Sequence, residues 1–323
     1  MSRIQAGNAL FWVESYTKTF RNHTLLKLYI LDTPSILKPD HQRLKYPSHN
    51  RDYGIEQDFE IWLRKQKELL TPDPAEATWH YLPVYWTRWH INHNFAAHGE
   101  GLAELQSAVN NIIIDDQRTF TITQFDGGTL VNLGRATEFT AARTTNAGID
   151  VPILCSPHRK PPVMPAKTLK ASFNGSFDTH PIRVEMQKRY AGSTGVIVGG
   201  SLPTRFYKRW FWAMNYNLNT MASYIALCPR GTSCNSFRFF EAMQLGTAPC
   251  LIGDADVRPF KKFIPWEEIS YYAATIDDLD NILTSINKTE ALEKGRKAYQ
   301  YWKNELYYQQ WCKYVIKELE HLG

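Results

Sequence analysis

Apolar runs of strand length alternate with amphipathic helix patterns along most of this chain, and this alternation constrains the fold more than any other feature. Apolar residues near a 3.6-residue period indicate helices, and short apolar runs bounded by turn residues indicate strands. The expected strands are 24–32, 78–86, 118–128, 169–176, 195–200, 224–229 and 248–253. The expected helices are 53–70, 102–111, 180–190, 205–222, 236–245 and one or two long helices over 289–322. Strands that alternate with helices form parallel sheets covered on both faces, so we predict an α/β fold.

The chain is long enough for two domains, since it has 323 residues. The segment 150–168 is rich in proline and has no periodicity, as is typical of a linker. We therefore expect a first domain over 1–160, a second over 161–305 and a C-terminal helix over 306–323. In sheets of this kind ligands bind beyond the carboxyl ends of the strands.

Composition limits the classes of binding partner and the cellular compartment that we expect. The net charge of +5 suits a small anionic ligand or a peripheral contact with an anionic membrane face, and it is too low for a dedicated nucleic-acid binder. The five cysteines show no metal-binding spacing, which indicates free thiols in a reducing compartment. The N-terminus has no long apolar core, and no run is long enough to span a bilayer. We expect a cytoplasmic protein, at most peripheral at the inner membrane face.

One stretch, "LCPRGTSCNSFRFFEAMQLGTAPCLIG", holds a strand, a Pro229-Arg230-Gly231 turn, a helix and a second strand. Gly231 allows the backbone to approach a ligand, and the unpaired N–H groups at the start of the helix, by Ser236, favour an anion. The alternative is a plain turn with Arg230 on the surface. Arg238 and Glu241 are three residues apart and share a helix face, where they form either an ion pair or a ligand-binding pair.

Several blocks resemble the exostosin-like glycosyltransferases, the family of the heparan glucuronyltransferases and the plant xyloglucan galactosyltransferases. The blocks are "YGIEQDFEIWL" with the following turn and strand, "RTFTITQFDGG", "ASFNGSFDTHPIR", the stretch quoted above, and "RPFKKFIPWEEIS". The resemblance implies a GT-B architecture, in which two Rossmann-like αβα domains face each other across a cleft and a long helix ends the chain. It also implies a nucleotide-sugar donor, usually a UDP-sugar, and inversion at the anomeric carbon.

The resemblance assigns roles to residues in both halves. It implies donor contacts for Asn174, Gly175, Arg183, Arg230, Gly231, Ser236, Arg238 and Glu241, with Glu241 holding the ribose and Arg183 facing the diphosphate. An inverting transfer needs a group that accepts the proton of the acceptor hydroxyl. Asp126 ends a strand in the first domain and matches the family's Asp, so we expect it to be this base, although a lone Asp there is often only a turn former. His80 and His93 are the alternatives.

The aromatic and histidine-rich segment 79–95 suggests an acceptor site, with His80, Trp86, Trp89 and His93 as contacts and packing as the alternative. His90 and His93 are three apart, but no carboxylate or cysteine completes a metal site. We read Asp254-Ala255-Asp256 as a solvated loop, and expect neither a metal nor another cofactor. The basic, aromatic segment 205–216 is either a membrane-surface patch or a helix with a buried aromatic face.

These observations together favour an inverting glycosyltransferase that moves a sugar from a nucleotide-sugar to a glycan or glycolipid in surface polysaccharide synthesis. The main alternative is a non-catalytic protein of the same fold that binds a glycan or partners an active enzyme. An epimerase with a bound dinucleotide is disfavoured, because no Gly-x-Gly-x-x-Gly follows the first strand.

Overall fold

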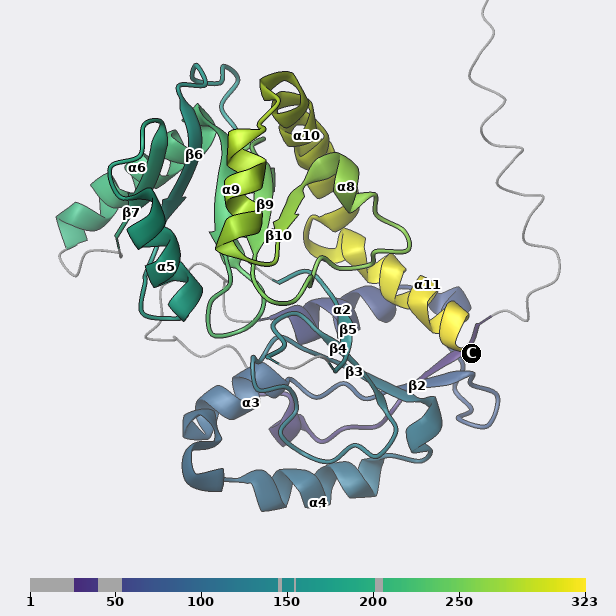
Figure 1. Cartoon of the computed structure of the whole chain (residues 1–323). Helices are drawn as coiled ribbons and strands as arrows, with labels where there is room; N and C mark the ends of the chain where they lie inside the picture. Colours follow the sequence, from purple (N-terminus) through teal and green to yellow (C-terminus); the bar gives the residue numbers. More distant parts are fainter. Residues whose placement is uncertain (1–25, 40–53, 145–146, 154, 201–205) are drawn as a thin grey trace, which may run out of the picture.

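The structure is a computed structural model, and it describes residues 26–39, 54–144, 147–153, 155–200 and 206–323 (Figure 1). The first 25 residues, on which the expectation of no secretory signal rests, lie outside the described residues, as do the first residues of three expected elements, at 24–25, 53 and 205. Within the described part of the chain, no helix is both long and apolar enough to cross a membrane.

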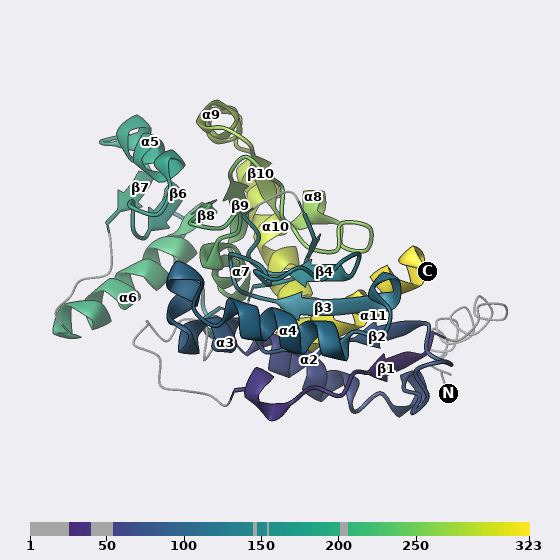
Figure 2. The same cartoon turned by 90° about the horizontal axis from the view of Figure 1, so that it is seen from below.

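The first sheet has five parallel strands in sequence order. They are β1 (Leu28–Ile30), β2 (Trp79–Tyr81), β3 (Thr119–Thr123), β4 (Thr137–Thr140) and β5 (Ile149–Asp150). The helices of this half are α2 (Ile55–Leu63), α3 (Trp86–Asn92) and α4 (Leu102–Ile112), with short 3₁₀ turns at Ser35–Leu37, Lys67–Leu69, Asn94–Gly99 and Asp116–Arg118. Helices α2 and α4 cover opposite faces of the sheet (Figures 1 and 2).

The second sheet is also parallel, in the order β10-β9-β8-β6-β7. Its strands are β6 (Leu169–Asn174), β7 (Val196–Gly199), β8 (Ser223–Pro229), β9 (Ala248–Ile252) and β10 (Tyr271–Ala273). Its helices are α5 (Pro181–Tyr190), α6 (Phe206–Ala222), α7 (Phe237–Gln244), α8 (Trp266–Ile269) and α9 (Ile276–Thr284). The strand order reverses between β6 and β8. This is the switch point at which doubly wound sheets bind ligands.

Alternate side chains of β8 enter two different cores. Ile225 and Leu227 pack in the cluster that contains residues of α5 and α9, whereas Ala226 and Cys228 join the cluster that contains α7. A strand buried on both faces has no polar side, and this explains why "YIALCP" reads as a continuous apolar run.

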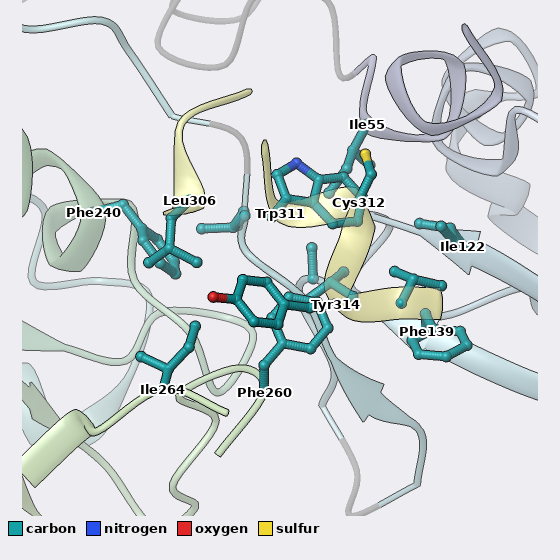
Figure 3. Packing of buried hydrophobic residues seen from close by; sticks show 14 of the residues in the cluster. Ile55, Ile122, Phe139, Phe240, Phe260, Ile264, Leu306, Trp311, Cys312 and Tyr314 are labelled. Atoms are coloured by element: carbon teal, nitrogen blue, oxygen red, sulfur yellow. The ribbon is translucent and has the colours of Figure 1, made fainter. Parts of the chain in front are cut away.

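The C-terminal tail joins the two halves. Helix α10 (Lys288–Tyr301) packs on β8 and β9; a π-helical turn (Trp302–Leu306) and a 3₁₀ turn (Tyr308–Trp311) lead to α11 (Cys312–Leu322). Trp311 stacks on Phe59 of α2 with ring centroids 6.1 Å apart, and Tyr314 stacks on Phe260 at 5.2 Å. Figure 3 shows this shared core, where Ile122 and Phe139 of the first sheet lie near residues of the tail. The expected GT-B arrangement of two αβα halves with a C-terminal helix is confirmed.

Some expected elements were too long and some were missed. The strand expected over 78–86 ends at Tyr81, and α3 starts at Trp86; Pro83 lies between them and can donate no ladder hydrogen bond. The helix expected over 53–70 ends at Leu63. Strand β4, "TEFT", was missed because two of its four residues are half-exposed and its apolar signal is short. All five cysteines are buried free thiols, as expected.

Candidate active site

A cleft of about 970 Å³ lies between the two halves. Side chains that follow β3 line one side, and the loops after β6 and β8 together with α6 and α7 line the other. Seven of the expected site residues line it: Asp126, Gly175, Arg183, Gly231, Ser236, Arg238 and Glu241. The carboxyl ends of strands from both sheets therefore meet at one cavity.

Arg183 ties together the two loops at the switch point. Its Nε donates to the carbonyl of Arg230 at 2.8 Å, Nη2 to that of Pro229 at 3.0 Å, and Nη1 to that of Ser176 at 2.8 Å. Burial, with a smaller contribution from nearby Arg238, lowers its pKa to about 10, so the guanidinium keeps its charge at neutral pH. Arg183 thus fixes both loops and places a positive charge at the cleft.

Two glycines keep side chains out of this region. A Cβ on Gly231 would lie 3.2 Å from Nη2 of Arg183, and a Cβ on Gly175 would lie 2.7 Å from the Phe173 ring. The backbone at both positions lines the cleft. A larger residue would displace Arg183 from its place beside Gly231, or the Phe173 ring from its place beside Gly175.

Arg230 is buried and pairs with a loop carboxylate. Its side chain is only 7% exposed and does not line the cleft. It pairs with Asp254 through Nη1 and packs its aliphatic carbons where a Cβ of Gly253 would be. The alternative of a surface arginine is therefore wrong, and the donor contact expected for this side chain stays a prediction.

The start of α7 presents a buried hydroxyl without a hydrogen-bond partner among the residues that the structure describes. Ser236 is the N-cap residue, but its side chain makes no capping bond, and within that part of the chain nothing pairs with its Oγ. The same residue lines the cleft. An N-cap hydroxyl that is buried and unpartnered beside the positive end of a helix is suited to an anionic oxygen.

Glu241 is the centre of a buried charged cluster in α7. It is 1% exposed, and its Oε2 accepts hydrogen bonds from Tyr216 Oη at 2.9 Å and from Arg238 Nη1. Burial by itself would raise the pKa of Glu241, but Arg238 and His158 outweigh it and lower the pKa to about 2. The ion-pair interpretation of Arg238 and Glu241 is therefore correct, and both side chains also line the cleft.

Three residues around Glu241 were missed from the sequence. His158 Nε2 lies 3.6 Å from Glu241 Oε1, and Trp212 stacks on Tyr216 with ring centroids 5.8 Å apart. The Arg238 guanidinium lies over the Tyr216 ring at 4.4 Å. His158 comes from the aperiodic linker, and the two aromatic residues from the basic, aromatic segment for which we offered only a membrane patch or a buried face. Side chains 205–211 of that segment lie outside those the structure describes.

Asp126 lies across the cleft, in the turn after β3. Burial raises the pKa of Asp126, although backbone N–H groups of Asp126 and Gly127 act in the opposite direction. The turn is braced at both ends: His90 Nε2 contacts the carbonyl of Thr129 at 3.2 Å, and Glu56 Oε1 accepts from the Gln124 N–H at 3.1 Å. A half-buried carboxylate on a fixed turn has the properties of a general base.

Asn174 hydrogen-bonds to a residue of the site and is not itself part of the cleft lining. Its carbonyl accepts a hydrogen bond from Arg238 Nε at 3.0 Å. Its side-chain Oδ1 accepts from Asn219 Nδ2 at 3.5 Å. Asn174 thus positions Arg238 through its carbonyl.

The expected acceptor contacts are not found at the cleft. His80 and Trp86 are fully buried, with His80 Nε2 3.1 Å from the carbonyl of Pro74 and Trp86 Nε1 donating to Thr121 Oγ1 at 2.8 Å. Trp89 and His93 stack on each other with centroids 3.7 Å apart, in the space where a Cβ of Gly101 would be. All four pack within the first half, so the packing alternative is correct and the sugar-stacking role is not.

The Asp254-Ala255-Asp256 loop uses its carboxylates for ion pairs. Asp254 pairs with Arg230, and Asp256 Oδ1 accepts from Arg258 Nε at 2.9 Å. Among the described residues, no group of three or more His, Cys, Asp or Glu side chains is arranged to hold a metal ion.

Comparison with known proteins gives matches over part of the chain. The plant relatives include the probable β-1,4-xylosyltransferase IRX10 of Arabidopsis thaliana, which is 46% identical over 72 residues, or 22% of this chain and 18% of that protein. The probable glucuronosyltransferase GUT1 of Oryza sativa subsp. japonica is 46% identical over 70 residues, or 21% of this chain and 17% of that protein. The matched segment therefore spans about a fifth of the length of these curated relatives.

Solved structures of the protein TarM are more distant. One covers 65% of this chain and 55% of that chain at 12% identity and a TM-score of 0.35. A TarM mutant from S. aureus gives 13% identity and the same TM-score. Similarity at this level supports no inference about function.

The family model settles the relationship. The model described as the exostosin GT47 domain matches residues 108–286, which is more than half of the chain and contains both Asp126 and the cluster around Glu241. The chain therefore belongs to the exostosin GT47 family of glycosyltransferases.

Proposed function

We propose that this protein is an inverting glycosyltransferase that transfers a sugar from a UDP-sugar to a glycan or glycolipid acceptor during synthesis of a surface polysaccharide. The observation that carries the proposal is the shared cleft: a positively charged switch point on one side and the half-buried carboxylate of Asp126 on the other. The plant relatives, named as probable xylosyl- and glucuronosyltransferases, support the same class of reaction.

The second half binds the donor in this proposal. The diphosphate lies at the backbone of Gly231 and the start of α7, where Ser236 Oγ and the charge of Arg183 face it. The ribose hydroxyls hydrogen-bond to the carboxylate of Glu241. Trp212 is partly exposed in the cleft and adds an aromatic surface at the same end.

The reaction is a single displacement. The acceptor hydroxyl oxygen forms a bond to the anomeric carbon while the bond from that carbon to the diphosphate oxygen breaks. The proton of the hydroxyl passes to Asp126, and UDP leaves with the bonding electron pair. Arg183, Arg238 and the positive end of α7 offset the charge that develops on the leaving group.

We further propose that this charge compensation needs no metal ion. Three sources of positive potential already face the cleft, and the carboxylates of Asp254 and Asp256 are occupied by Arg230 and Arg258. A cytoplasmic location, with peripheral contact at the inner membrane face, stays part of the proposal. It is supported by the five buried free thiols, since such thiols persist in reducing compartments.

The test is a panel of nucleotide-sugars measured by thermal unfolding, followed by NMR of the product. A donor present at a hundredfold excess over Kd should stabilise the folded state by about 2.7 kcal/mol. UDP and a UDP-sugar should stabilise, whereas uridine without phosphate should do so far less. The product should have the opposite anomeric configuration to the donor. Retained configuration would exclude the single displacement, and a panel with no stabilising nucleotide-sugar would exclude the proposed activity.

A further inference from the structure

Two phenylalanines form an exposed aromatic surface inside the cleft. Phe95, in the turn Asn94–Gly99, is 40% exposed, and Phe125 directly precedes Asp126. Their rings stack with centroids 6.3 Å apart and an interplanar angle of 21°, and both residues line the cleft. This surface therefore adjoins the proposed base, on the side of the cleft opposite the donor loops.

The inner ring of the pair is held firmly from behind. The Phe125 ring packs against His90 with centroids 4.5 Å apart, and a Cβ on Gly127 would lie 2.8 Å from it. His90 is itself buried and contacts the carbonyl of Thr129. The buried ring of His90, the half-buried Phe125 and the exposed Phe95 thus contact one another in a row from the core to the cleft.

The outer ring is presented by a strained backbone. Phe95 has a φ of 59°, and Asn94 and His98 in the same turn have φ of 53° and 55°. Left-handed φ is uncommon outside glycine and is an outlier for a bulky residue such as Phe. A strained residue that is 40% exposed contributes little to the core, and such strain concentrates at ligand sites.

We propose that the Phe95–Phe125 pair is the acceptor subsite, on which one ring of the acceptor glycan stacks by its C–H face. The inference rests on the proposed function, which requires an acceptor hydroxyl next to Asp126. An aromatic face binds an apolar surface, and a pyranose with equatorial substituents, as in β-1,4-linked xylo- or gluco-oligosaccharides, presents such a C–H face. Thr87 and Gln124, from the same half of the protein as the pair, also line the cleft.

The first test compares Phe95→Asn with a matched control, Leu130→Asn. Asn tolerates left-handed backbone, so both variants remove the apolar side chain without changing the turn. Leu130 is 42% exposed and also has a φ of 59°, but it does not line the cleft. The probes are xylohexaose and cellohexaose, titrated by calorimetry at saturating UDP. Phe95→Asn should weaken binding of the oligosaccharide about tenfold, while Phe95→Tyr and Leu130→Asn should stay within about twofold.

A second measurement separates this subsite from the donor site. UDP affinity should be the same in wild type and Phe95→Asn, and the melting temperature of the variant should not fall, because Asn tolerates the left-handed backbone. The proposal is overturned if Phe95→Asn binds the oligosaccharide like wild type, if it loses UDP and oligosaccharide affinity together, or if wild type binds neither oligosaccharide. In each case, stabilisation of wild type by a UDP-sugar would leave the proposed function standing.

Discussion

Replacement of Glu241 by glutamine removes a charge from the buried cluster that borders the cleft and keeps the size and one oxygen acceptor. The wild-type carboxylate is buried beside Arg238, Tyr216 and His158. Burial by itself would raise the pKa of Glu241, but Arg238 and His158 outweigh it and lower the pKa from an ordinary 4.5 to about 2. Each pKa unit corresponds to about 1.4 kcal/mol. The charge therefore contributes roughly 3 kcal/mol to the free energy of unfolding at neutral pH. Because the pKa of the folded protein is lowered, this stability is present above about pH 4.5 and is lost as pH falls toward 2.

Because loss of the Glu241 charge destabilises the folded protein, the choice of substitution at this position matters. Glu241→Ala would leave Arg238 and Tyr216 without their acceptor, so it tests the fold and the ligand site at once. Glu241→Gln should lower the free energy of unfolding in urea by roughly 3 kcal/mol and remain folded at neutral pH. If Glu241 binds the ribose, the variant should also raise the Kd of UDP about tenfold to a hundredfold, since a charge-assisted hydrogen bond is lost.

The matched control is Glu60, a second buried carboxylate that does not line the cleft. Its Oε2 accepts from Tyr85 Oη at 2.8 Å, and its Oε1 accepts from Lys38 Nζ at 2.9 Å and from Arg64. Glu60→Gln should lose stability and bind UDP like wild type. Calorimetry decides between the two roles: if Glu241→Gln also binds UDP with wild-type affinity, Glu241 is only a structural partner of Arg238.

Three further outcomes follow from the site. Asp126→Asn should keep UDP affinity and melting temperature but lose about 10²–10⁴-fold in turnover. Because burial raises the pKa of Asp126, wild-type kcat/KM should fall with decreasing pH through a pKa above the ordinary aspartate value. Turnover of Asp126→Asn within a few-fold of wild type would remove Asp126 from the mechanism. Enzyme activity should survive EDTA, and Asp254→Ala should change it little. Asp256→Ala should destabilise the folded protein, because buried Arg258 loses an ion-pair partner. Loss of activity in EDTA with rescue by manganese would contradict the metal-free mechanism. Ser236→Ala removes a buried hydroxyl that has no hydrogen-bond partner among the described residues. The ligand-free variant should therefore be at least as stable as wild type, while its Kd for UDP rises about tenfold. Unchanged affinity would exclude the hydroxyl as a phosphate ligand.

Local chemistry made the fold predictable from the sequence. Buried parallel strands must be apolar on both faces, and helices that cover them must be apolar on one. The alternation of the two patterns therefore predicted most strands of both sheets and the helices α2, α4, α5, α6 and α7, but not β4. Pro181 at the first position of α5 and the glycine that follows α7 marked helix ends in the same local way. The loops that follow β3, β6 and β8 contain Asp126, Gly175 and Gly231. They could be expected at one cleft, because ligand sites in such sheets form at the carboxyl edge.

Only the tertiary structure decided which side chains in the loops and helices after the strands face the cleft. Arg230 and Arg183 lie at the same switch point, yet Arg230 folds back onto Gly253 and Asp254 while Arg183 lines the cleft. Trp86 and Phe95 belong to one aromatic segment, yet one is core and the other is exposed in the cleft. Sequence periodicity reports which residues share a face of an element. Which face meets the cleft depends on how distant elements pack, and the sequence pattern carries no record of those contacts.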